Sequence, residues 1–176
     1  MKPRVRMIRI ALGATLAGGA ALIGAPQLGA QVFGGHNSDA PVDYAADRIE
    51  LQDKQKRVVL SGNVDITQGE LRLRAARTTV AYTDTGSLKI QRMDATGGVF
   101  VSRGSESANG DVAIYDFNKR IITMVGNVRL KRANGDNLNG GRMVIDLNSG
   151  VSSVAGGGGK GGRVSGSFAV PKNSTN

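Results

Sequence analysis

Apolar residues recur at every second position in most of the chain beyond residue 40. In RVVLSGNVDI (57–66) the even positions from Val58 to Ile66 are apolar or glycine, and the odd positions, apart from Val59, are polar. The stretch ITMVGNVRL (122–130) repeats this pattern and the same Gly-Asn-Val centre. Such alternation places the apolar side chains on one face of an extended chain, so it predicts half-buried β-strands.

The alternation continues elsewhere, between clusters of turn-forming residues such as TDTGS (83–87) and RANGDN (132–137). No window in this part of the chain shows the 3.6-residue period of an amphipathic helix. We therefore predict an all-β, antiparallel domain of short strands. The further alternating segments contain Ile49/Leu51, Leu71/Leu73, Val80/Tyr82, Leu88/Ile90, Val99/Val101, Tyr115/Phe117, Met143/Ile145/Leu147 and Phe168/Val170.

A larger unit is written twice, because RVVLSGNVDI…RTTVAYTDTG returns as RIITMVGNVRL…GRMVIDLNSG, with Gly62 and Gly126 in matching places. A weaker copy lies between them, around TGGVFV and GDVAIYDFNKR. Such repeats are typical of stacked β architectures, where each unit needs its neighbour to bury its apolar face. Glycine inside a strand usually marks a bend or bulge. We predict that Gly62 and Gly126 are corners at which one chain folds into two facing sheets.

The first 30 residues have the order of a secretory signal peptide. Four basic residues precede an apolar, Ala/Gly-rich run over 10–25, and APQLGAQ (25–31) follows. We expect cleavage after Ala30. The alternative is a retained membrane anchor, although the run is shorter than the ~20 apolar residues of a spanning helix.

Removal of residues 1–30 would leave one domain of ordinary size and lower the formal charge. The whole chain has a net charge of +9, and without the four basic residues of the leader 19 basic residues face 14 acidic ones, a net charge of +5. The chain has no cysteine, so the exported protein would not rely on disulfides, which suits a bacterial periplasm. We expect a flexible lead-in over 31–40, the domain over 41–171 and a disordered tail over 172–176.

The inventory of reactive residues argues against an enzyme. His36 is the only histidine and there is no cysteine, so neither a Cys/His nucleophile nor a multi-His metal site can form. The run GGGGKGG (156–162) has Val154 where a phosphate-binding loop needs its first glycine, and Gly161 instead of Ser or Thr after the lysine. We expect this run to be a floppy connection. No enzymatic activity, cofactor, metal or nucleic-acid binding is expected, the last because no aromatic residues interleave with the basic ones.

Three segments carry a resemblance to a known family. They are YAADRIELQDKQKRVVLSGNVDITQGELRLRAARTTVAY (44–82), AIYDFNKRIITMVGNVRLKRANGDNLNGGRMVIDL (113–147) and GKGGRVSGSFAVP (159–171). Together they resemble the LptA/OstA-like periplasmic lipopolysaccharide-transport family, over roughly residues 40–172. The Gly-Asn-Val motif alone is weak, whereas the ordered set of strands is specific.

The resemblance implies a V-shaped antiparallel β-jellyroll, or β-taco, of roughly sixteen short strands. It implies that acyl chains of lipopolysaccharide lie in an apolar groove while the sugars stay in water, and that no reaction is catalysed. It also implies head-to-tail self-association by strand addition, with an inner-membrane LptC-like protein at the N-terminal edge and an outer-membrane LptD-like protein at the C-terminal edge. The chain would then be part of a bridge that serves outer-membrane assembly.

Candidate groove residues come from two sources. The family pattern implies Val42, Tyr44, Val101, Tyr115 and Phe117. Periodicity alone adds Leu60, Val64, Ile66, Leu73, Val80, Met124, Val128, Leu130, Ile145 and Phe168. The alternative is that these side chains fill an ordinary core between two sheets.

Basic residues on the outward positions of the predicted strands have two interpretations. They could contact the anionic phosphates of a glycolipid head group at the mouth of the groove, or they could form a solvated surface. These residues are Arg72, Arg74, Arg77, Arg129, Lys131, Arg132 and Arg142.

Two alternative functions remain open from the sequence. An LptC-like component of the same pathway would keep residues 8–25 as a membrane helix, and a mature N-terminus at Gln31 would exclude it. A structural β-scaffold with a filled core would take up no lipid.

Overall fold

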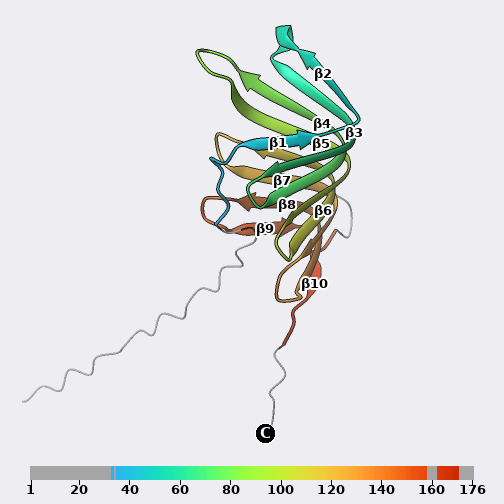
Figure 1. Cartoon of the computed structure of the whole chain (residues 1–176). Coiled ribbons are helices and arrows are strands. Elements are labelled where there is room, and N and C mark those ends of the chain that lie inside the picture. Colours follow the sequence, from blue (N-terminus) through green and yellow to red (C-terminus); the bar gives the residue numbers. More distant parts are fainter. Residues whose placement is uncertain (1–32, 34, 158–161, 171–176) are drawn as a thin grey trace, which may run out of the picture.

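Ten β-strands of one antiparallel sheet make up most of the described part of the chain, which is Phe33, residues 35–157 and residues 162–170 (Figure 1). The structure is a computed structural model. The strands are β1 (Val42–Ala45), β2 (Arg48–Gln52), β3 (Arg57–Gln68), β4 (Leu71–Thr83), β5 (Lys89–Arg103), β6 (Glu106–Asp116), β7 (Ile121–Lys131), β8 (Asn137–Asp146), β9 (Ser152–Ala155) and β10 (Ser165–Ser167). A short 3₁₀ turn, Asp53–Gln55, joins β2 to β3.

The strands follow one another across the sheet as an antiparallel meander. The hydrogen-bonded order is β1-β3-β4-β5-β6-β7-β8-β10, with β2 also paired to β3 and β9 also paired to β8. Each edge therefore consists of two short strands that share one long neighbour. At the N-terminal edge, β1 pairs with residues 65–68 of β3 and β2 pairs with residues 57–61. At the C-terminal edge, β10 pairs with residues 137–139 of β8 and β9 with residues 142–145.

The long strands bend near their middles, and the bends fold the sheet into two arms. The pairing register shifts at each of the five long-strand interfaces, between Ser61 and Val64 on β3 and between Val125 and Val128 on β7, for example. Figure 1 shows the strands curving round one side of the domain. The first arm carries the β3–β4, β5–β6 and β7–β8 turns, and the second arm carries the β2–β3, β4–β5, β6–β7 and β8–β9 turns.

The first Gly-Asn-Val motif forms one of these bends. Gly62 and Asn63 both have positive φ angles, +76° and +44°, which glycine adopts freely and asparagine tolerates. The Asn63 Nδ2 atom donates a hydrogen bond to Asp47 Oδ2 (2.9 Å), and the Asp47 amide donates to the Gly62 carbonyl (2.9 Å). A Cβ atom on Gly62 would lie 2.9 Å from the Cβ of Asp47 and overlap its carboxylate. The site therefore requires glycine for its conformation and for the close approach of Asp47.

The second motif repeats this arrangement with Asp111 in the place of Asp47. Gly126 and Asn127 have φ angles of +80° and +48°, and Asn127 Nδ2 donates to Asp111 Oδ2 (2.9 Å). A Cβ atom on Gly126 would lie 2.9 Å from the Cβ of Asp111. The prediction that these two glycines are corners is confirmed, but they bend one continuous sheet into two arms instead of joining two separate sheets. The repeat also includes an aspartate that contacts each corner, Asp47 or Asp111.

The prediction of an all-β, antiparallel fold is confirmed, with one difference in the strand count. The described residues form ten strands instead of roughly sixteen, because each long strand continues through its corner and supplies a segment to both arms. The expected alternating strand at Phe168 and Val170 is wrong, since β10 ends at Ser167. The signal peptide predicted over 1–30 and the tail predicted over 172–176 lie outside the described residues.

Candidate functional site

The apolar face of the folded sheet points into the space between the arms. In β4, for example, Leu71, Leu73 and Ala75 are buried while Arg72 and Arg74 are exposed. Most residues that the sequence predicted to face inward are buried here, as expected. They are Leu60, Val64, Ile66, Leu73, Val80, Val101, Tyr115, Met124, Val128, Leu130 and Ile145.

An open cavity lies between the arms at the N-terminal end of the sheet. Its volume is about 290 Å³, and side chains of β1 to β5 and of the β4–β5 turn form its walls. The lining is apolar except for the phenol groups of two tyrosines. We call this space the open cavity; it is lined by Val42, Tyr44, Ile49, Leu51, Val58, Leu60, Ile66, Val80, Tyr82, Leu88, Ile90 and Met93.

Several side chains that line the open cavity are in contact with water. Leu51 is 65% exposed, Leu88 is 67% exposed and Tyr44 is 59% exposed. A contiguous group of exposed large apolar side chains in a concave surface is typical of a binding site. At the edge of this region Tyr82 donates a hydrogen bond to Asp53 (3.2 Å). The open cavity thus combines a polar edge with an apolar interior.

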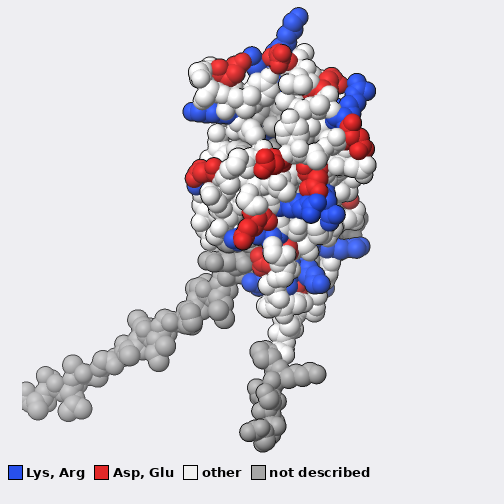
Figure 2. Space-filling view, viewed as in Figure 1, with Lys and Arg blue, Asp and Glu red and all other residues white. Residues whose placement is uncertain are grey.

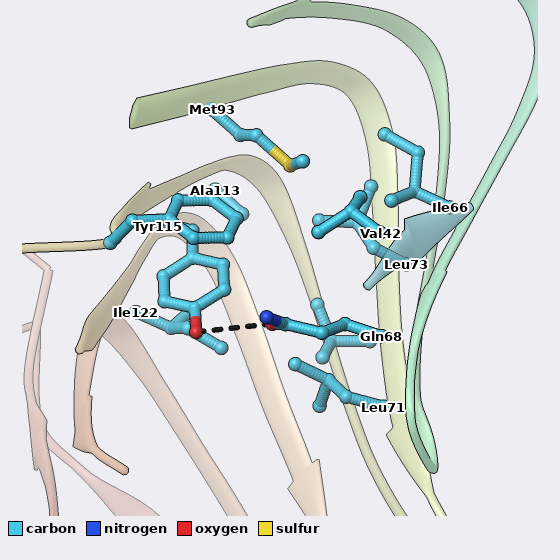
Figure 3. Close-up of a pocket in the computed structure, with 11 residues that line it drawn as sticks. Val42, Ile66, Gln68, Leu71, Leu73, Met93, Ala113, Tyr115 and Ile122 are labelled. Atoms are coloured by element: carbon cyan, nitrogen blue, oxygen red, sulfur yellow. Dashed lines mark hydrogen bonds between the residues drawn. The ribbon is translucent and has the colours of Figure 1, made fainter. Parts of the chain in front are cut away.

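The open cavity continues into a narrow part of the interior, which Figure 3 shows. The free space there is only about 20 Å³. Val42, Ile66 and Met93 line both spaces, so the two are adjacent. The rings of Tyr115 and Phe117 stack at a centroid distance of 4.0 Å and form part of the wall.

A buried polar pair crosses this narrow part. Gln68, at the end of β3 in the first arm, and Tyr115, in β6 in the second arm, point toward each other, and the Tyr115 hydroxyl donates to Gln68 Oε1 (3.2 Å; Figure 3). We call Gln68 and Tyr115 the crossbar. Burial raises the pKa of the Tyr115 phenol, while a hydrogen bond with Ser38 and the charge of Arg120 act in the opposite direction. Tyr115 therefore stays a neutral hydrogen-bond donor at neutral pH.

The residues before β1 also contact the crossbar. Gln68 Nε2 donates to the carbonyl oxygens of Ser38 (2.8 Å) and Ala40 (3.1 Å), and His36 Nε2 donates to Gln68 Oε1 (3.1 Å). Burial lowers the pKa of His36; its hydrogen bond to Gln68 raises the pKa and the nearby charge of Arg103 lowers it. The sequence predicts a flexible lead-in over 31–40, and in the structure described residues of this region make specific contacts with Gln68. The region 31–40 also contains Phe33, whose side chain is 0% exposed and belongs to the apolar core.

The interior of the C-terminal half is packed. Met124, Val128, Leu130 and Ile145 were predicted groove residues, and each is at most 2% exposed. None of these four lines the open cavity or the narrow space next to it. Their positions fit the alternative interpretation, in which part of the predicted set is ordinary core.

The remaining predicted groove residues occupy three kinds of position. Val42 and Phe117 are half-buried in the lining of the interior. Tyr44 is exposed but lines the open cavity. Phe168 follows β10, is 70% exposed and lines neither the open cavity nor the narrow space next to it.

The predicted basic residues lie on the outer face of the sheet. Six of the seven are exposed, and the seventh, Arg132, is half-buried in the β7–β8 turn. The residues next to them on the strands are buried on the inner face, and these include Leu71, Leu73, Val128, Leu130 and Met143. This placement favours the solvated surface over contact with a head group between the arms. Figure 2 shows basic and acidic side chains interspersed on the visible face. The outward set is Arg72, Arg74, Arg77, Arg129, Lys131 and Arg142.

Two of these arginines have specific partners on the outer face. Arg72 forms an ion pair with Asp65 on the neighbouring strand β3, and this pair lowers the pKa of the Asp65 carboxyl. The guanidinium of Arg74 lies 4.8 Å from the centroid of the Phe100 ring, within the range of a cation–π contact. Both contacts tie adjacent strands together.

Seven of the twelve residues that line the open cavity were not among the candidate groove residues. Ile49/Leu51 and Leu88/Ile90 were identified as alternating pairs, but their alternation gave no sign that they face a cavity. Gln68 and Phe33 were not singled out at all. Among the described residues, no group of three or more His, Asp or Glu side chains is placed to hold a metal ion. No helix in that part of the chain has the length and apolar character needed to cross a membrane.

Comparisons with known proteins agree with this architecture. The chain resembles, in fold, the crystal structure of LptH from Pseudomonas aeruginosa, described as the LptA homologous periplasmic component of the lipopolysaccharide transport device. The two structures share 20% sequence identity at a TM-score of 0.66, over 76% of this chain and 98% of LptH. This similarity supports the fold.

A sequence relative is an uncharacterized protein of Rhizobium meliloti (strain 1021). It is 31% identical over 121 residues, which are 65% of this chain and 64% of the relative. The chain thus spans slightly less than two thirds of the length of this relative.

The family model described as LptA/(LptD N-terminal domain) LPS transport protein matches residues 45–151. The match covers more than half of the 176 residues and runs from the last residue of β1 to the residue before β9. It confirms the resemblance drawn from the sequence. The chain belongs to the LptA/LptD N-terminal domain family of lipopolysaccharide transport proteins.

Proposed function

We propose that this chain is a periplasmic carrier of a lipopolysaccharide-type glycolipid. The acyl chains lie in the apolar groove between the two arms, and the sugars remain in water. The observation that carries the proposal is the open cavity, an apolar space of about 290 Å³ that holds exposed leucine and tyrosine side chains. The family description supplies the class of cargo.

The energetics favour an acyl chain as the occupant. Each methylene group removed from water stabilises the complex by about 0.8 kcal/mol. Burying the exposed Leu51 and Leu88 side chains adds further apolar area to the same interface. A phosphate or sugar in this space would lose its hydration and find almost no hydrogen-bond partner in the lining. The groove therefore selects the lipid part of the cargo.

The two edges of the sheet support assembly by strand addition. β1 and β2 at one edge, and β9 and β10 at the other, each have one side that pairs with no strand among the described residues. Open edges of this kind accept a strand from another chain. We propose head-to-tail self-association, an LptC-like partner at the N-terminal edge and an LptD-like partner at the C-terminal edge. Such a heterologous contact would extend the groove from one domain to the next.

The proposal includes export and excludes catalysis. The chain acts in the periplasm after cleavage of the leader behind Ala30, as part of a bridge from the inner to the outer membrane. It moves the lipid without chemical change.

A filled structural scaffold is the second candidate, and the packed C-terminal half favours it. Met124, Met143 and Ile145 are 0% exposed, so this part of the interior has no room for a chain in the present conformation. The open cavity argues against a scaffold, because a purely structural domain gains nothing from exposed Leu51 and Leu88. An LptC-like anchored component differs in its N-terminus, and a mature protein that begins at Gln31 would exclude it.

Photo-crosslinking in cells tests the carrier function. A benzophenone amino acid replaces Tyr44 in the open cavity, Tyr115 in the crossbar or, as a control, Arg129 on the outer face. We expect an adduct with lipopolysaccharide at Tyr44 and at Tyr115 but not at Arg129. If the protein is folded and exported and neither inner position captures lipid, the carrier function is wrong and the scaffold is the better account.

A further inference from the structure

The residues before β1 cross the open side between the two arms, which lies opposite the corners and is called here the mouth of the V, and they contact both arms. On the first arm, the Phe33 amide donates to Glu106 Oε2 (2.9 Å) and the Gly35 carbonyl accepts from Arg103 (3.3 Å). On the second arm, Asp39 forms an ion pair with Arg120 in the β6–β7 turn (2.7 Å). We call Phe33 together with residues 35–40 the strap. Figure 1 shows it passing along the side of the domain opposite the corners, toward β1.

Phe33 anchors the strap in the core. Its side chain is 0% exposed and is the largest among those that are fully buried in the described part of the chain. It belongs to the same apolar cluster as the groove residues Leu73, Val101 and Tyr115. An aromatic ring from outside the sheet thus occupies apolar space that the sheet itself provides.

The crossbar completes the closure. Gln68 uses both atoms of its amide: Oε1 accepts from Tyr115 and His36, and Nε2 donates to the carbonyls of Ser38 and Ala40. The strap, the first arm and the second arm therefore meet in one hydrogen-bond network. Both hydrogen bonds that Gln68 Nε2 donates go to the strap, so departure of the strap leaves this buried amide nitrogen without those partners.

The location of this network conflicts with an occupied groove. A glycolipid whose acyl chains lie between the arms must let its sugars leave through the mouth of the V. The strap joins the two arms on this side. The crossbar lines the narrow space of about 20 Å³, whereas the open cavity next to it is free. Cargo and strap cannot both occupy the interior around Gln68 and Tyr115.

We propose that the strap is an internal occupant that closes the groove of the empty protein, and that the acyl chains of arriving cargo displace it. This inference rests on the proposed carrier function. Displacement exchanges one apolar group for another, because the Phe33 ring leaves the interior as the acyl chain enters. Entry thus starts in the open cavity and advances past the crossbar as the strap leaves.

The absence of cysteine in the chain allows a direct test. In the full exported protein, the Ser38→Cys variant places a single thiol at a half-buried position of the strap and leaves the Phe33 anchor in place. Its rate of alkylation by a soluble maleimide is measured with and without purified rough-type lipopolysaccharide, and binding is measured in parallel. Phe168→Cys is the exposed control and Ala108→Cys, at a 0% exposed core position, reports general unfolding. Circular dichroism checks that each variant is folded.

We expect slower alkylation of Ser38→Cys than of the exposed control without lipid, and a rise of about threefold or more when lipopolysaccharide binds, as expected for a local opening. Phe168→Cys should react fast in both states and Ala108→Cys slowly in both. Binding without a rise at Ser38→Cys would overturn the strap but leave the carrier function intact. Alkylation of Ser38→Cys as fast as that of Phe168→Cys in the empty, folded protein would show that the strap is not seated, and would also overturn the proposal. Absence of binding to every variant would overturn the carrier function and the strap with it.

A second variant tests the strap without a thiol. Phe33→Ala removes the anchoring ring, so lipopolysaccharide no longer competes with it, and its Kd should fall by about tenfold relative to the wild type. Phe168→Ala, the matched loss of an exposed ring outside the lining of both spaces, should leave the Kd unchanged. An unchanged Kd for folded Phe33→Ala would contradict competition between strap and cargo.

Discussion

Replacement of the corner glycine Gly62 by alanine should destabilise the domain by two separable effects. The first is backbone strain, because Gly62 has a φ of +76°, and a left-handed conformation costs an L-residue about 1–2 kcal/mol. The second is a steric conflict, since the new Cβ atom would lie 2.9 Å from the Cβ of Asp47 and overlap its carboxylate. Relief of that overlap moves Asp47 away from Asn63 and breaks a hydrogen bond worth about 1 kcal/mol.

The chain provides a matched control for the first effect alone. Gly98, at the corner of β5, has nearly the same φ of +77°, but no atom outside its chain neighbours lies within 4 Å of a Cβ built there. Gly98→Ala should therefore cost about 1–2 kcal/mol, whereas Gly62→Ala should cost about 2–3 kcal/mol. Gly126→Ala should match Gly62→Ala, because Asp111 stands in the same relation to it as Asp47 does to Gly62.

Urea unfolding followed by circular dichroism measures these differences. With a slope of about 2 kcal/mol per molar urea, Gly62→Ala should lower the midpoint by about 1–1.5 M and Gly98→Ala by about 0.5–1 M. In the Asp47→Ala background the additional cost of Gly62→Ala should shrink, because the overlapping carboxylate is absent. Equal midpoint shifts for Gly62→Ala and Gly98→Ala would refute the role assigned to the corner aspartate.

Three further predictions address the groove, the core and the strap. Leu51→Asp in the open cavity should weaken lipopolysaccharide binding about tenfold to a hundredfold, since burial of a leucine side chain is worth about 1.5–3 kcal/mol. Val125→Asp, at an exposed apolar position outside the cavity lining, should leave binding unchanged. Equal losses of affinity for the two variants in an equilibrium binding assay would show that the added charge alone weakens binding. Ile145→Ala should lower the free energy of unfolding by about 2–5 kcal/mol because it leaves a cavity in a packed interior. Val125→Ala, at an exposed position, should change this free energy by less than about 0.5 kcal/mol. Similar urea midpoints for the two variants would contradict a packed C-terminal half. The pKa of His36 is lower in the folded protein than in the unfolded chain, so its contribution to the free energy of unfolding is complete above the unfolded pKa of 6.5 and is lost as the pH falls through the folded pKa. Below pH 6.5 the stability of the wild type should therefore decline more than that of His36→Gln. Parallel curves of stability against pH for the two proteins would disprove a buried, neutral His36.

The inward face of the strands could be predicted because its signal is local. A strand alternates its side chains between two faces, so the spacing of apolar residues alone identifies the buried set from Leu60 to Ile145. The two Gly-Asn-Val corners were equally readable, since few residues other than glycine and asparagine adopt positive φ. The family resemblance, carried by the order of these strands, was confirmed over residues 45–151.

The division of the interior could not be predicted in this way. Leu51 and Ile145 have the same kind of alternating neighbours, yet one is 65% exposed in the open cavity and the other is 0% exposed. The difference depends on how closely the two arms approach at each point along the groove, and no single strand encodes that distance. Phe168 was misplaced for a related reason: its alternation with Val170 continues past the point where β8 offers a partner.

Sequence alone therefore determined that the domain is an antiparallel β-structure with two glycine corners and one apolar face, because φ preferences and period-two patterning act over a few residues. Only the tertiary structure decided which apolar residues surround an open cavity and which are packed core. It also brought together Phe33 with Glu106, and Gln68 with Tyr115, 73 and 47 positions apart in the chain. Contacts at such separations arise only when the corners fold the two arms against each other, so the closure of the groove is a property of the fold.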